Sequence, residues 1–327
     1  MSEWIIEDDD ATRRVDRIIR SILSHLPLSL IYSSIRKGLI KLNNKRVVAK
    51  EIVNIKDILY IDDSLMQKEI EIEKISNRKK DSKESKKMKV DILLRSPQLL
   101  FVNKKMGEPS HGKNSIDEKV KQYFPSTSQS LSFSVGTLHR LDKDTTGIIT
   151  FSQNLLGAHL FSDYLRDRLI FRYYIGINEG KIKNGTWIVP SNNNSSNELF
   201  CNVEMTDVWE IEYSKKHDLS LVAYSLITGK KHQIRRAANF FKKNLFCDSK
   251  YGSKKKEFPS YFLHSFALEF SKEIFKEVPR IIKAPLPKRF LLAIEKYFPA
   301  SANKIKEYGN IGFLDYILKN TIKKKKC

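Results

Sequence analysis

Hydrophobic and polar positions near the start of the chain follow a helical period. Within residues 13–25 the apolar side chains recur three and four positions apart, at Val15, Ile18, Ile19, Ile22 and Leu23. This spacing places them on one face of an amphipathic helix, with arginines off that face. A second short helix is predicted over residues 30–37, with Ser29 as its N-cap and Gly38 just past its end.

The pattern then changes to the two-residue alternation of strands. Residues 39–48 predict a hairpin that turns at Asn43–Asn44, because asparagine tolerates the backbone of tight turns. Residues 51–61 predict a further strand. Residues 13–63 therefore form a small αβ module in our interpretation.

The remainder divides by composition. Residues 64–90 are charged and poor in large apolar side chains, which is typical of a linker. Residues 91–299 interleave strand and helix patterns, and residues 300–327 end in a basic stretch that we expect to be a solvated tail. The run NNNSSN at 192–197 predicts a polar loop.

Three segments of the long central part carry candidate chemistry. The run GTLHRLDKDTTG (136–147) precedes an alternating apolar strand and is followed by an amphipathic helix over 154–168. Loops before core strands often hold functional side chains, although Asp142 could instead cap a turn or pair with Arg140. We interpret His139 as a side chain that holds this loop.

The other two segments are strand patterns. RLIFRYYIGINEG (168–180) includes the β-prone run YYIGI, in which Tyr174 could be an ordinary core aromatic. LSLVAYSLITGKKHQIR (219–235) alternates as a strand and then turns at Gly229.

Charge narrows the class of partner. The 327 residues suggest about two domains, and 59 Lys+Arg against 38 Asp+Glu give a formal net charge of +21. A charge of this size favours a polyanion such as nucleic acid. Solubility, or a lysine-rich background composition, would explain the same number.

Cysteine and hydropathy patterns exclude other classes. Cys201, Cys247 and Cys327 are far apart and form no CxxC pair, so we expect no zinc site and a reducing compartment, the cytoplasm. No apolar run approaches the about 18 residues of a membrane span, and no signal peptide is evident. No phosphate loop or dinucleotide fingerprint is evident, which is in keeping with a protein that needs no cofactor.

The three central segments together resemble the RluA family of RNA pseudouridine synthases. HRLDKDTTG, RLIFRYYIGINEG and TGKKHQIR match its signatures in order, and the later segments FCDSKYG (246–252) and YFLHSFALEF (261–270) are also similar. The resemblance implies that specific uridines in RNA are converted to pseudouridine. It also implies residue roles: Asp142 as catalytic carboxylate, Arg235 as its partner, Tyr174 stacking on the base, Leu263 lining the base pocket, and Arg140 replacing the extruded base in the RNA stack.

Residues 13–63 resemble the S-four type RNA-binding domain, whose second helix binds structured RNA. That helix carries Arg36 and Lys37 here. Cations on an exposed helix can contact RNA phosphates. The pattern PLSLIYSSIRKG is most similar to the RluC subgroup, which implies large-subunit ribosomal RNA as the partner.

The resemblance also implies an α+β catalytic domain over 91–299, with a mixed or antiparallel central sheet and flanking helices. We expect a monomer. Thr146, Lys105 and Ala237 depart from the family pattern. Alternatives are a non-catalytic RNA-binding or ribosome-assembly protein with the same fold, an RNA methyltransferase, and a DNA-binding protein.

Overall fold

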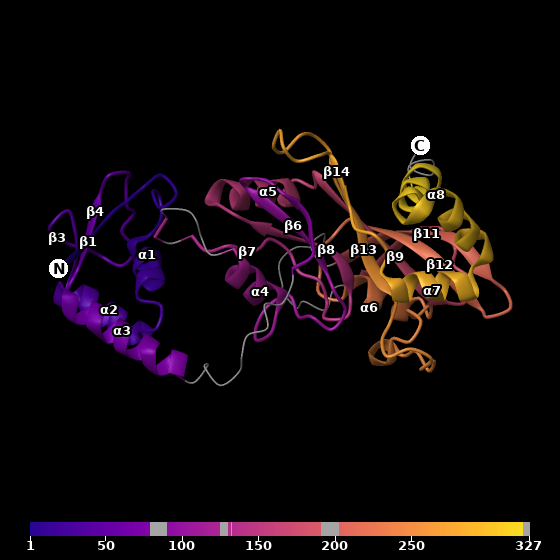
Figure 1. The fold of residues 1–327 in the computed structure, drawn as a ribbon, viewed down its shortest axis with the longest axis horizontal. Coiled ribbons are helices and arrows are strands. Elements are labelled where there is room, and N and C mark those ends of the chain that lie inside the picture. Colours follow the sequence, from indigo (N-terminus) through magenta and orange to yellow (C-terminus); the bar gives the residue numbers. More distant parts are fainter. Residues whose placement is uncertain (79–89, 125–129, 132, 191–202, 323–327) are drawn as a thin grey trace. The chain divides into compact units, whose positions relative to one another are not determined.

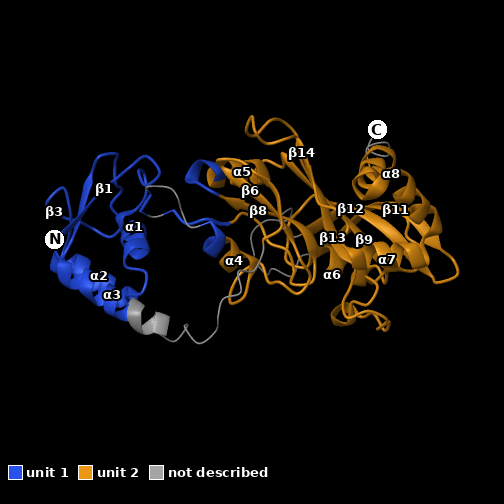
Figure 2. Cartoon of the chain, viewed as in Figure 1, with its two compact units in different colours: residues 1–89, 121–136, 153–157 blue, residues 90–120, 137–152, 158–327 orange. Residues whose placement is uncertain are grey.

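The computed structural model describes residues 1–78, 90–124, 130–131, 133–190 and 203–322. The expected polar loop at 192–197 lies outside these residues. The chain forms two compact units (Figure 2). Unit 1 comprises residues 1–89, 121–136 and 153–157, and unit 2 comprises residues 90–120, 137–152 and 158–327.

Unit 1 is a four-stranded antiparallel sheet with three helices. The strand order is β1 (Ser2–Ile5), β4 (Ile58–Ile61), β2 (Ile40–Leu42) and β3 (Lys45–Arg46). The helices are α1 (Val15–Ile22), α2 (Leu28–Lys37) and α3 (Asp63–Arg78). The first strand precedes the expected module, and the strand expected over 51–61 is confined to β4.

Local signals in unit 1 are mostly confirmed. The apolar face of α1 is buried in the unit's core. Asn43 and Asn44 take positive φ angles of 49° and 62° at the hairpin turn, and Gly38 ends α2 in the left-handed region at φ 73°. The predicted Ser29 cap is wrong: Pro27 occupies the N-cap, and Ser29 lies inside the helix.

The linker prediction for residues 64–90 is wrong for its first half, because residues 63–78 form α3. Leu65 and Glu69 are buried on this helix. The Glu69 carboxylate accepts the backbone N–H of His25 at 2.8 Å. A charged segment thus folds where a few inward side chains find apolar or hydrogen-bonded partners. Residues 79–89 lie outside the described part.

Unit 2 contains a central mixed sheet (Figure 1). Its main strand order is β10 (Gly185–Pro190), β11 (Val203–Ser214), β12 (Leu219–Leu226), β9 (Ile170–Glu179), β13 (Leu263–Phe270), β8 (Thr146–Ser152), β6 (Leu99–Lys104) and β5 (Ile92–Arg95). Strand β14 (Ile281–Lys283) pairs with β13, and β7 (Gly136–Thr137) pairs with β8. Along this main order the pair β8–β13 is parallel and the other described pairs are antiparallel. This confirms the expected α+β class.

Helices pack against two regions of this sheet and form a hydrophobic core with each. Helix α5 (Leu155–Arg166) contributes Phe161 to a core with β6, β8 and β13. Helices α7 (Lys288–Tyr297) and α8 (Pro299–Ile317) pack on a second core with β9, β11 and β12. Further helices are α4 (Ile116–Tyr123), whose last residues fall in unit 1, α6 (Gln233–Phe240) and the short η1 (Ser249–Tyr251). Among the described residues, none of the helices has the length and apolar character to cross a bilayer.

The solvated tail expected over 300–327 is wrong for residues 300–322. Helix α8 continues into η2 (Leu318–Ile322), and Phe313, Leu314, Ile317 and Leu318 are buried in the second core. The expectation rested on the lysine run at 323–326, whereas residues 300–322 themselves carry many apolar side chains. Residues 323–327 lie outside the described part.

Candidate active site

The loop between β7 and β8 carries Asp142 and is pinned from several sides. The Ser110 hydroxyl donates to the Leu141 carbonyl at 2.7 Å and accepts the Leu141 N–H at 2.9 Å. The His139 Nε2 accepts the Thr150 N–H at 3.1 Å, and burial lowers the pKa of His139 to about 3. A neutral acceptor ring fits the structural role that we expected for His139.

A buried lysine, Lys104, also holds this loop in place. The Lys104 ammonium donates to the backbone carbonyls of Lys105, Glu108 and Lys143 at 3.0, 2.8 and 2.8 Å. Burial lowers the pKa of Lys104 to about 8. These three bonds satisfy the buried amine and fix the backbone next to Asp142.

The end of the loop is locked to β13. At Gly147, a Cβ would lie 2.1 Å from the Ser265 carbonyl oxygen, and its φ of 104° also favours glycine. The neighbouring Thr146 hydroxyl bonds to the buried His264 Nδ1 at 2.8 Å. This close approach places Leu263, at the start of β13, beside the Asp142 loop.

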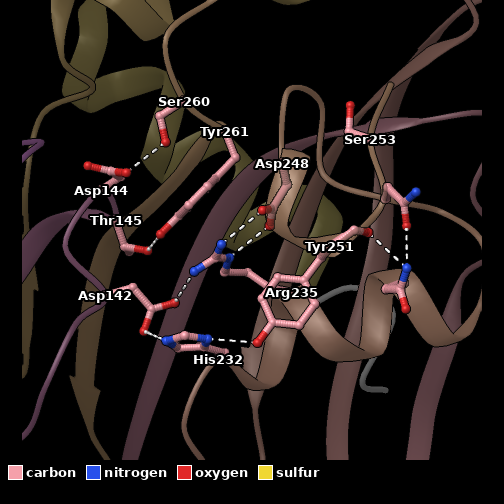
Figure 3. A network of polar contacts seen from close by, with 12 residues as sticks. Asp142, Asp144, Thr145, His232, Arg235, Asp248, Tyr251, Ser253, Ser260 and Tyr261 are labelled. Carbon is pink, nitrogen blue, oxygen red and sulfur yellow. Dashed lines mark hydrogen bonds and ion pairs between the residues drawn. The ribbon is translucent and has the colours of Figure 1, made fainter. Parts of the chain in front are cut away.

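Arg235 on α6 joins two carboxylates (Figure 3). Its Nε and Nη2 donate to the two oxygens of Asp248 at 2.7 and 2.8 Å, and its Nη1 donates to Asp142 at 3.2 Å. The guanidinium also lies 4.2 Å from the ring centre of Tyr261 and 4.7 Å from that of Tyr251. Burial acts to lower the pKa of Arg235, but the bonds to Asp248 and Asp142 raise it overall. The charge is therefore permanent and its direction is fixed.

His232 lies on the other side of Asp142. Its Nε2 is 3.4 Å from the second Asp142 oxygen, and its Nδ1 is 2.7 Å from the Tyr251 hydroxyl. A positive φ of 56° just before α6 turns the ring toward the loop. Burial lowers the pKa of His232, so the ring is neutral near pH 7. A Tyr251 hydroxyl that donates to Nδ1 leaves Nε2–H to face the carboxylate.

A cavity of about 270 Å³ opens beside Asp142. Its lining includes all the site residues predicted for the catalytic part: Arg140, Asp142, Tyr174, Arg235 and Leu263. The size is just below the about 300 Å³ at which pockets for small ligands begin. A cavity of this size suits a single flat ring rather than a large cofactor.

The walls of this cavity differ in character. Tyr174 follows the strand alternation: its neighbours Tyr173 and Ile175 enter the core beneath α7 and α8, so Tyr174 points to the cavity face. Burial raises the pKa of Tyr174, so its phenol is neutral. Arg140 is exposed at the rim, and the Asp142 side chain keeps 14% of its surface exposed. A ligand can therefore reach the carboxylate.

Arg36 and Lys37, the other two predicted site residues, lie on unit 1. Both are exposed in the last turn of α2. No described residue of unit 1 lines the cavity beside Asp142.

Four residues of this network were missed from the sequence: His232, Asp248, Tyr251 and Tyr261. Each lies within a matched segment, His232 in TGKKHQIR and Asp248 in FCDSKYG. A signal was therefore present, but spacing along the chain does not indicate which side chains meet. Of the departures from the family pattern, Ala237 is buried in α6 and Lys105 is exposed.

The arrangement offers carboxylate chemistry rather than a metal centre. Among the residues that the structure describes, no group of three His, Cys, Asp or Glu side chains could hold a metal ion. One accessible carboxylate faces an aromatic and an apolar wall, and its other contacts are a guanidinium and an imidazole. Such a carboxylate can act as a nucleophile or stabilise positive charge on a bound ring.

Known proteins that are similar to this chain are RNA pseudouridine synthases. A family model described as RNA pseudouridylate synthase matches residues 98–240. An uncharacterized RNA pseudouridine synthase of Mycoplasma capricolum is 27% identical over 83% of this chain and 92% of its own length. The ribosomal large subunit pseudouridine synthase C of Vibrio vulnificus is 26% identical over 86% of this chain and 91% of its own.

A solved structure has the same fold. Human RNA pseudouridylate synthase domain containing 4 superposes with a TM-score of 0.52 at 20% identity, over 63% of this chain and 92% of that one.

Proposed function

We propose that this chain, which belongs to the RluA-like RNA pseudouridine synthases, isomerises specific uridines of large-subunit ribosomal RNA with Asp142 as its catalytic carboxylate. The observation that carries the proposal is the Asp142–Arg235 contact at 3.2 Å beside a cavity for one ring. The relatives named for the ribosomal large subunit support the choice of RNA.

The reaction breaks the C1′–N1 bond of uridine, rotates the uracil and joins C1′ to C5, and the proton on C5 is lost while N1 gains one. Asp142 either attacks C1′ and forms a covalent intermediate, or assists a glycal intermediate by taking a sugar proton. Both routes need an ionised carboxylate with an open approach. No external group is transferred, so the proposal requires no cofactor.

Arg235 supplies the countercharge that such a carboxylate needs in a half-buried site. Asp248 accepts two of its hydrogen bonds and fixes the plane of the guanidinium. The remaining Nη1 is directed at Asp142. A preorganised donor of this kind stabilises negative charge without reorganising during the reaction.

The cavity walls support binding of an extruded base. Removing uracil from the stack costs a few kcal/mol, and stacking on an aromatic ring returns about 1–3 kcal/mol. Tyr174 provides the ring in our proposal, and Leu263 covers the other side. Exposed Arg140 at the rim fills the position that the base leaves.

Unit 1 supplies RNA affinity in this proposal. Arg36 and Lys37 are exposed at the end of α2, where they can contact phosphates of folded RNA. The proposed compartment is the cytoplasm, and the proposed working form is a monomer. Cys247 is a buried free thiol, which fits a reducing environment.

The direct test uses large-subunit ribosomal RNA transcribed without modifications. The purified chain is incubated with it, and pseudouridines are mapped by carbodiimide labelling and primer extension. We expect stops at a small number of uridines. RNA binding without any pseudouridine would instead favour a non-catalytic ribosome-assembly role.

A further inference from the structure

An aromatic groove lies beyond Tyr251, next to the Asp142 network. It has a volume of about 470 Å³ and is lined by Val189, Pro190, Arg236, Asn239, Phe240 and Tyr251. Phe240, the last residue of α6, keeps 56% of its surface exposed, and the next residue, Phe241, keeps 38%. Two adjacent exposed aromatic side chains beside a groove indicate a binding surface rather than ordinary surface scatter.

The Phe240 ring rests on a rigid support. Phe240 and Phe241 meet edge to face with ring centres 5.3 Å apart. Phe241 in turn stacks on the buried Trp187 of β10 at 5.2 Å. A ring held in this way presents its surface to a ligand at little cost in conformational entropy.

The charges near the groove favour a negatively charged ligand. None of the six lining residues is acidic, and Glu204, which lies near them, is buried in an ion pair with Arg236. Lys242 and Lys250 are exposed and lie between Phe240 and Tyr251 in the sequence, and the Lys250 ammonium is 5.9 Å from the centre of the Tyr251 ring. Exposed cations beside an aromatic surface are the combination that binds single-stranded nucleic acid.

Tyr251 connects this groove with the catalytic network. Its hydroxyl is bonded to His232 and its ring lies on the Arg235 guanidinium (Figure 3). The same residue also lines the groove. A strand whose target base enters the cavity beside Asp142 therefore has the groove within reach of its neighbouring nucleotides.

We propose that this groove is a subsite for unpaired nucleotides flanking the target uridine, and that Phe240 stacks on one of their bases. The inference rests on the proposed function and adds a contact that helps to position the RNA strand. Stacking on a phenyl ring tolerates all four bases, so the subsite recognises an unpaired strand rather than a sequence.

The test compares Phe240→Ala and Phe240→Trp with Leu292→Ala. Leu292 on α7 is 54% exposed and lies outside the groove, so it matches Phe240 in exposure. The probe is a fluorescein-labelled single-stranded RNA of about 12 nucleotides, within the length that such sites bind. Affinity is measured by anisotropy at about 0.1 M salt. Folding of each variant is checked by circular dichroism.

We expect Phe240→Ala to weaken binding by at least about 5-fold, and Phe240→Trp and Leu292→Ala to stay within about twofold of the parent chain. A 4-thiouridine probe should also crosslink to α6 in the parent chain. Equal affinity of Phe240→Ala and Leu292→Ala, or crosslinks only elsewhere, would overturn the inference and leave the groove to a different partner.

The same variants are assayed for pseudouridine on an RNA that the parent chain modifies. Phe240→Ala should raise KM and leave the rate at saturating RNA within about threefold, since Phe240 does not contact the reacting base. If the parent chain forms no pseudouridine, the proposed function fails, and the anisotropy result still decides whether the groove binds RNA.

Discussion

Arg235 is bound to Asp248 through two hydrogen bonds and to Asp142 through only one. The Asp248 carboxylate is almost fully buried, whereas that of Asp142 is open to the cavity. Asp248 thus anchors the guanidinium, and Asp142 is the carboxylate that remains available to a ligand.

Asp248→Asn should damage both stability and turnover. It breaks a buried ion pair, which costs about 3–5 kcal/mol of unfolding free energy. A displaced guanidinium should also lower kcat by about 10²-fold. Asp144→Asn is the matched control, because Asp144 bonds to Ser260 and not to Arg235. Urea unfolding and steady-state kinetics measure the two effects, and an equal loss in both variants would disprove the anchoring role.

Tyr174→Phe and Tyr174→Leu should differ sharply. Burial raises the pKa of Tyr174, so its phenolate is not available as a base near neutral pH, and the ring is the part that matters in our proposal. Phenylalanine keeps the stacking surface. Leucine loses about 1–3 kcal/mol of stacking, or about 5-fold to 150-fold in kcat/KM. An inactive phenylalanine variant that still folds would assign the function to the hydroxyl.

Arg36→Ala combined with Lys37→Ala should weaken RNA binding and reduce its salt dependence. Two lost phosphate contacts lower the slope of log Kd against log salt by about 1.5. Binding is titrated at several salt concentrations. Lys50→Ala with Lys68→Ala, two exposed lysines elsewhere in unit 1, removes the same charge. The same change of slope in both double variants would mean that only net charge matters.

Stability should fall as the pH decreases from 6.5 toward 4, in part because of His264. Burial lowers the pKa of His264 to about 4, so in this range the unfolded chain binds a proton that the folded chain does not. The stability contributed by the neutral ring is fully present above pH 6.5. It is then lost at up to about 1.4 kcal/mol per pH unit. Urea unfolding at pH 7 and pH 5 checks this, and His264→Asn should flatten the difference.

The sequence was sufficient for the parts that depend on local pattern. The α1 face, the Asn43–Asn44 turn and the Gly38 helix end follow from side-chain period and backbone preference. The resemblance placed Asp142 and Arg235 together, although 93 positions separate them. Nothing in the local pattern could have done so.

The predictions of a linker and of a solvated tail were wrong because a few buried side chains decide whether a segment folds, whatever its average composition. Residues 63–78 look charged, and the lysine run at 323–326 suggested a solvated tail from residue 300 on. Yet Leu65 and Phe313 are buried and their segments are helical. Asp248 and His232 were missed for a related reason. Their importance lies in contacts made across the fold, and the sequence records only that they stand within matched segments.

The measurement closest to the central claim is single-turnover pseudouridine formation by Asp142→Asn on an RNA that the parent chain modifies. Affinity for the same RNA is measured in parallel. We expect the variant to form no pseudouridine and to bind the RNA within about twofold of the parent, because phosphate contacts supply most of the binding. Pseudouridine made by the asparagine variant at a rate near that of the parent would contradict the role assigned to Asp142.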